Sequence, residues 1–139
     1  MSSTLIAERV RWRRERQQRA KDSRRELYGQ FLTSLNEAAE SLWAVSLGDR
    51  RGTDGAPFDE TLRGEVHRTG LYSYREQVMI LAPEGVRASA DQAVDRVREY
   101  RDCLMSGSQT GSPVETAAMN AYKAAVKSLR QAMRSDLER

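Results

Sequence analysis

The residue types that most often carry catalysis or hold metal ions are sparse in this chain. His67 is the only histidine and Cys103 the only cysteine, so an internal disulfide and a zinc site built on paired cysteines are excluded. A di-iron site in a helical bundle needs Glu-x-x-His on two helices, whereas Gly64 stands three residues before His67. We therefore expect no metal and no cofactor, a surface position for His67, and a buried, inert Cys103.

Carboxylate pairs occur at Asp91/Asp95 and Glu37/Glu40, on helix faces expected to be solvated. General acid–base catalysis needs two carboxylates that converge in a cleft with separated pKa values, and their spacing alone does not provide that. The chain also has no glycine-rich phosphate loop, no Gly-x-Ser-x-Gly turn and no Cys/His nucleophile arrangement. The sequence predicts a protein that is not an enzyme, with no small-molecule substrate.

The strongest signal is a basic segment near the start of the chain. Between Glu8 and Glu26, nine arginines and lysines stand against four acids, a net charge of +5. The rest of the chain nets −2, so the whole charge of +3 comes from this segment. Such asymmetry indicates an anionic partner or surface.

Four helices and no strand are predicted from apolar residues that recur at steps of three and four. The first runs from Ser3 to Leu47, with Gly48 as its C-cap and a loop over Asp49–Pro57 after it. The second spans Phe58–Leu81, with a kink or a close helix approach expected at Gly70; the alternative is an extended segment over Leu71–Tyr74.

The third helix begins at Ala82-Pro83-Glu84, with proline at the first helical position, and ends at Gly107. The fourth begins at Ser112, and Glu115 completes a capping box with it. The residues predicted to face the core are Leu27, Tyr28, Phe31, Leu32, Leu35, Ala38, Ala39, Leu42, Trp43 and Val45, then Phe58, Leu62, Val66, Tyr74, Val78 and Leu81, then Val86, Ala90, Ala93, Val94, Val97, Tyr100 and Leu104, and finally Val114, Ala118, Ala121, Ala125, Leu129, Ala132, Met133 and Leu137.

These helices and their short connections predict an all-α fold, a four-helix up-down bundle with a long N-terminal helix. At 1.5 Å per residue the first helix reaches roughly 65 Å and the others roughly 35–40 Å. The expected parts are a projecting basic half, residues 1–26, and a single bundle domain, residues 27–139. The projecting half carries Leu5 and Trp12 on one face, and exposed apolar residues on a lone helix usually find a partner.

Three short motifs resemble a group of actinobacterial helical-bundle proteins that have no known activity. They are Arg24-Arg25-Glu26-Leu27-Tyr28-Gly29-Gln30-Phe31-Leu32 followed by Trp43, Leu81-Ala82-Pro83-Glu84-Gly85-Val86-Arg87, and Arg134-x-Asp136-Leu137. The resemblance implies a basic helix that continues into an apolar one, and no catalytic residue or cofactor. Many members carry a membrane-spanning helix just before the basic segment. This chain begins at Met1 without one, so it is either a soluble relative or lacks an anchor.

A helical interaction or scaffold protein is therefore the predicted function. The basic helix would mediate self-association, giving a homodimer, or docking on an anionic membrane surface. The residues expected to bind the partner are Leu5, Trp12, Arg9, Arg13, Arg16, Arg24 and Arg25. With a lone cysteine and no apolar run near the ~18–20 residues of a membrane span, a cytoplasmic location is expected, free or peripheral to the inner face of the membrane.

The alternative is a nucleic-acid-binding protein that uses the same arginines. Residues 19–25 partly resemble the contact region of a basic zipper, which continues into a heptad helix and reads the major groove. The zipper would comprise Tyr28, Leu35 and Leu42, for which the later helices compete.

Overall fold

A computed structural model describes residues 2–48 and 58–139 of the chain. These residues form α-helices and no strand, which confirms the all-α prediction. The helices are α1 (Ser2–Ser46), α2 (Phe58–Arg68), α3 (Leu71–Leu81), α4 (Glu84–Met105) and α5 (Pro113–Leu137). The loop predicted over Asp49–Pro57 lies outside the described residues.

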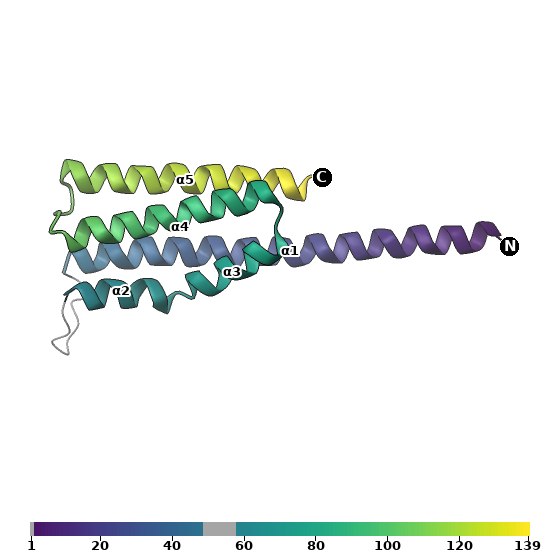
Figure 1. The fold of residues 1–139 in the computed structure, drawn as a ribbon, viewed down its shortest axis with the longest axis horizontal. Helices are drawn as coiled ribbons and strands as arrows, with labels where there is room; N and C mark the ends of the chain where they lie inside the picture. Colours follow the sequence, from purple (N-terminus) through teal and green to yellow (C-terminus); the bar gives the residue numbers. More distant parts are fainter. Residues whose placement is uncertain (1, 49–57) are drawn as a thin grey trace.

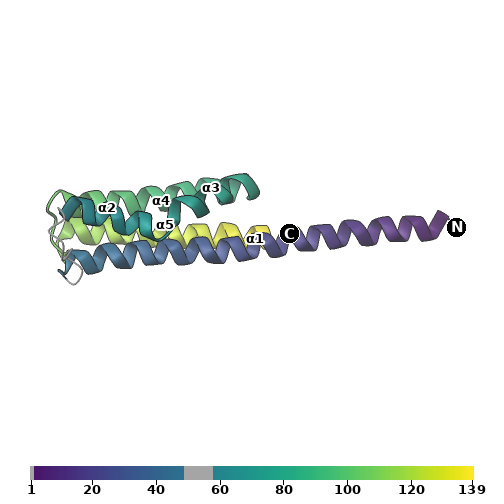
Figure 2. The same ribbon diagram turned by 90° about the horizontal axis from the view of Figure 1, so that it is seen from below.

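The longest helix, α1, has two halves with opposite surroundings. Its C-terminal half packs against α2, α3 and α4 and, to a smaller extent, against α5, while α5 packs chiefly along α4. Its N-terminal part extends past the ends of the other helices (Figures 1 and 2). All residues from 3 to 20 are exposed, whereas Leu27 and Tyr28 are buried and begin the core. We call residues 3–20 of α1 the rod.

The predicted core stripe of α4 is confirmed in full. Its members are all buried: Val86, Ala90, Ala93, Val94, Val97, Tyr100 and Leu104. They meet buried residues of α1, among them Phe31, Leu35 and Leu42, in one contiguous cluster. Because Tyr28, Leu35 and Leu42 lie in this core, the zipper face that the basic-zipper interpretation needs is already covered within the chain.

The prediction of one helix over Phe58–Leu81 is wrong, because the structure divides this range into α2 and α3. α2 ends at Arg68, and Gly70 takes a positive φ of 74° that a residue with a side chain rarely adopts. The amide of Gly70 donates to the carbonyl of His67, and its own carbonyl accepts from Tyr74 in α3. An added Cβ at Gly70 would meet just the Tyr74 ring, so glycine serves the turn here and not a close helix approach.

Four residues predicted to face the core are exposed. Phe58, Leu81 and Val114 stand at or next to helix ends, where no neighbouring turn covers them. Trp43 lies inside α1 yet is 45% exposed, because α5 does not close over it. Cys103, expected to be buried, is half-buried.

The helix starts differ slightly from the predicted caps. Pro83 is the N-cap of α4, with an extended backbone, and not its first helical residue. Ser112 caps α5 as predicted, since its hydroxyl accepts from the amide of Glu115 at 3.3 Å, with Pro113 following. Glu115 itself does not complete the capping box: its carboxylate accepts from the amide of Gly111 at 3.1 Å.

Candidate functional site

Five of the seven residues predicted to bind a partner line one shallow depression on the rod. Leu5 and Trp12 are each 62% exposed, and Arg9, Arg13 and Arg16 surround them together with Glu8. The guanidinium of Arg16 lies 5.0 Å from the centre of the Trp12 ring, a cation–π distance. We call these six residues the rod patch.

The other two predicted residues lie elsewhere and have partners within the chain. The Nε of Arg24 donates to Asp136 at the end of α5 at 3.0 Å, with just 23% of its side chain exposed. Arg25 pairs with Asp22 at 3.2 Å on the surface. Arg24 therefore joins α1 to α5, and of the five predicted arginines Arg9, Arg13 and Arg16 line the rod patch.

Acidic, apolar and basic side chains each repeat along the rod, a pattern that was not among the predictions. Glu8, Glu15 and Asp22 are spaced seven residues apart, which is two helical turns, so they share one face. Leu5 and Trp12 repeat with the same period beside them, and Arg9 and Arg16 repeat on the other side of the apolar pair. The rod therefore presents three adjacent stripes, which we call acidic, apolar and basic after the residues that repeat in them. The acidic stripe of the rod contains the acids Glu8 and Glu15 together with Arg19 and Arg11, and the Nε of Arg11 lies 3.8 Å from Glu15.

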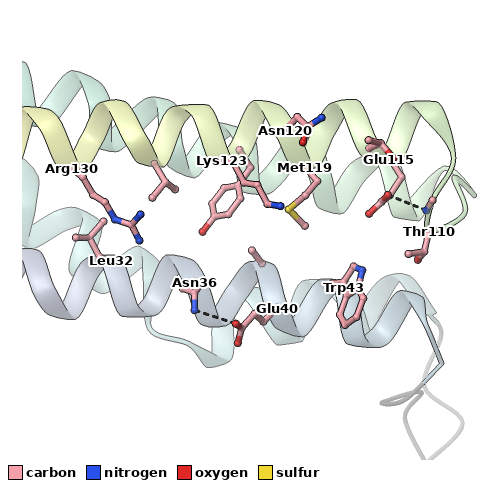
Figure 3. Close-up of a pocket in the computed structure, with 15 residues that line it drawn as sticks. Leu32, Asn36, Glu40, Trp43, Thr110, Glu115, Met119, Asn120, Lys123 and Arg130 are labelled. Atoms are coloured by element: carbon pink, nitrogen blue, oxygen red, sulfur yellow. Dashed lines mark hydrogen bonds between the residues drawn. The ribbon is translucent and has the colours of Figure 1, made fainter.

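A groove of about 670 Å³ runs between α1 and α5, and no part of it was predicted (Figure 3). Its floor is apolar, with Leu32, Ala39 and Trp43 from α1 and Met119, Tyr122 and Val126 from α5. Lys123 and Arg130 stand on the α5 side, and Asn36 and Glu40 on the α1 side, where they are hydrogen-bonded to each other at 3.3 Å.

Polar contacts hold α5 at both ends of this groove. At one end, the Tyr28 hydroxyl donates to Asp136 at 2.7 Å, beside the Arg24 contact. At the other end, the hydroxyls of Ser46 and Thr110 are 2.6 Å apart. The groove therefore lies between these two sets of hydrogen bonds.

Glu115 is a buried carboxylate near the contact between Ser46 and Thr110. It is 5% exposed and accepts from the Tyr100 hydroxyl at 2.8 Å as well as from Gly111. Burial, and then the bond to Glu115, raises the pKa of Tyr100. Burial, and then the bond to Asp136, likewise raises the pKa of Tyr28. Both carboxylates are therefore occupied in holding helices together.

Tyr122, which lines the groove, is a third tyrosine with a raised pKa. Burial raises the pKa of Tyr122 to about 12, Arg130 opposes the shift, and Glu40 adds to it. Its ring lies on the apolar floor of the groove and is just 6% exposed, so it packs mainly within the chain.

The remaining candidates for chemistry lie on solvated faces. His67 is exposed and packs against Tyr72, with 5.0 Å between ring centroids. Asp91 pairs with Arg75 at 2.8 Å and Asp95 with Arg98 at 3.5 Å. Over residues 2–48 and 58–139, no group of three or more His, Cys, Asp or Glu side chains could hold a metal ion.

Comparisons of the chain with family models, with curated proteins and with solved structures found no match. The resemblance to actinobacterial helical-bundle proteins therefore stays a prediction. Within the described part of the chain, no helix combines the length and the apolar character needed to cross a bilayer.

Proposed function

We propose that this chain is a non-enzymatic interaction module that self-associates through the rod. In this proposal the helices form a four-helix up-down bundle, in which α2 and α3 together take the place of one helix. The helix α1 continues beyond the bundle as the rod. The bundle is a rigid base, and the rod carries the partner-binding surface.

The supporting observation is the exposure of large apolar side chains on the rod, which no other helix of the described residues covers (Figure 1). Leu5, Ile6 and Trp12 are each 62% exposed on the rod. Burying one such side chain is worth about 1.5–3 kcal/mol, so a partner that covers several of them gains a substantial free energy. A second copy is the simplest such partner, because homo-oligomers are the commonest assemblies of soluble proteins.

Light scattering coupled to size exclusion tests this proposal. The purified chain should have at least twice the 15.8 kDa mass of one copy, and the double variant Leu5→Asp/Trp12→Asp should return to 15.8 kDa. Ile80→Asp is the matched control, because Ile80 is 78% exposed on α3, away from the rod, and should leave the mass unchanged. A monomeric wild-type chain, or an unchanged mass in the double variant, would contradict the proposal.

A second candidate function is nucleic-acid binding by the rod. It is favoured by Arg9, Arg13 and Arg14, which have no ion pair within residues 2–48 and 58–139. Arginines with free guanidinium groups suit phosphate contacts, which dominate non-specific affinity.

Fluorescence anisotropy of a labelled mixed-sequence duplex at two salt concentrations tests the second candidate. Changing Arg9, Arg13 and Arg14 to Ala should weaken binding and reduce the salt slope by about 3. Lys127→Ala, an exposed change on α5, is the control and should leave binding unchanged. Absence of salt-sensitive binding by the wild-type chain would exclude this function.

A further inference from the structure

We infer that the groove between α1 and α5 is the binding site for the rod of a second copy of this chain. This inference rests on the proposed self-association and adds the surface that receives the rod. The groove spans residues 115–130 of α5, about 22 Å, and the rod is about 27 Å long, both at 1.5 Å per residue. The rod is thus long enough to fill the groove.

The three stripes of the rod match the cross-section of the groove. The apolar stripe, Leu5 and Trp12, fits the apolar floor, where Trp43 is itself uncovered. The acidic stripe then lies beside the α5 wall, which carries Lys123 and Arg130. The basic stripe lies beside the α1 wall, which carries Glu40 and Asn36.

The spacing of the charges also agrees along the groove. Glu8 and Glu15 are seven residues apart on the rod, and Lys123 and Arg130 are seven apart on α5. Each pair spans two helical turns, about 10 Å, so both acids can meet a base at once, with Glu15 exchanging its exposed contact with Arg11 at 3.8 Å for one with a base of α5.

The handedness of the helix then selects one direction for the rod. Viewed into the groove as in Figure 3, α5 lies above α1. Residues of a right-handed helix advance clockwise when seen from its N-terminus. When Leu5 and Trp12 face the floor of the groove, Glu8 and Glu15 therefore face α5 if the rod runs antiparallel to the α1 of the receiving copy. This direction brings Leu5 toward the end of the groove where Trp43 is exposed.

A mixing experiment separates this contact from rod-to-rod pairing. The rod variant Trp12→Glu and the groove variant Met119→Glu should each be monomeric alone at a concentration where the wild-type chain associates. Mixed in equal amounts, they should form a complex with twice the mass of one chain, because one supplies an intact groove and the other an intact rod. Ile80→Glu, which places the same charge on an exposed apolar residue of α3, is the matched control here, and circular dichroism checks that each variant is folded.

The outcomes distinguish the two proposals. If Met119→Glu associates like the wild-type chain while Trp12→Glu is monomeric, the rods pair with each other, and the groove inference fails while self-association stands. If the wild-type chain is monomeric, both fail. If both variants are monomeric but their mixture does not associate, the groove is not the site that receives the rod.

Charge reversal tests the direction and the pairing. The change Glu8→Lys/Glu15→Arg should weaken association about tenfold or more, and so should Lys123→Glu/Arg130→Glu. A mixture of the two double variants should bind at least tenfold more tightly than either alone, because it restores opposite charges at the same positions. Equal affinity for the mixture and the separate variants would overturn the assignment of these residues.

Discussion

The contact of Tyr28 and Arg24 with Asp136 should be the main polar link between α1 and the end of α5. Asp136→Ala removes the acceptor of the Tyr28 hydroxyl, and Tyr28 is 3% exposed. A buried hydroxyl without a partner costs about 1–3 kcal/mol. Arg24, a quarter exposed, loses an ion pair worth about 1 kcal/mol at most. The free energy of unfolding should therefore fall by about 3 kcal/mol.

A double-mutant cycle makes this prediction specific. Tyr28→Phe alone should cost about 1 kcal/mol, because Asp136 keeps its contact with Arg24. Tyr28→Phe/Asp136→Ala should cost about 2 kcal/mol, less than Asp136→Ala alone and well below the sum, since the double variant loses the hydrogen bond and the ion pair but leaves no buried hydroxyl unpaired. Urea unfolding followed by circular dichroism, at equal protein concentrations, measures all four proteins.

Asp95→Ala provides the matched control for this cycle. Asp95 also pairs with an arginine, Arg98 at 3.5 Å, but its side chain is 61% exposed, so the change should cost less than about 0.5 kcal/mol. The reasoning is refuted if Asp136→Ala costs no more than Asp95→Ala, or if the two changes in the cycle simply add.

Two further predictions concern backbone strain and alkaline pH. Gly70→Ala should lower the free energy of unfolding by about 1–2 kcal/mol because of its positive φ. Gly64→Ala, inside α2 with open space around its Cβ, should raise it by about 0.5–1 kcal/mol; thermal melts that rank the two glycines the other way would contradict this. The pKa of Tyr122 is raised from 10.0 to about 12 in the fold, so its stabilising contribution is complete below pH 10 and is lost between pH 10 and 12. The loss is about 1 kcal/mol at pH 11, and urea unfolding at pH 9 and 11 should show a smaller pH effect in Tyr122→Phe; an equal effect in both proteins would contradict it.

The core of the helices could be predicted wherever a helix is covered along its whole length. The stripe of α4 agrees residue by residue, because α4 has α1, α2, α3 and α5 as neighbours. Predictions failed at Phe58, Leu81 and Val114, since a repeat of three and four does not reveal where the neighbouring helices end. Gly70 was recognised as an irregular position, but whether it bends a helix or divides it depends on its backbone angles.

The candidate site was predictable on the rod and hidden in the groove. Leu5, Trp12 and the arginines beside them are local to one helix, so their shared face follows from the helical repeat alone. The acidic stripe, with Glu8 and Glu15, could have been found by the same rule. Lys123, Arg130 and Trp43 gave no such signal, because they belong to two helices separated by most of the chain.

Three properties follow from the sequence alone: the chain is helical, its positive charge lies near its start, and certain side chains share a face of each helix. These properties depend on residues within one or two helical turns of each other. Three other features depend on helix packing: Arg24 contacts Asp136, Trp43 is 45% exposed, and a groove remains between α1 and α5. Those features arise from how closely two distant helices approach, and that distance is set by the packing of α5 on α4 and by the polar contacts at its two ends.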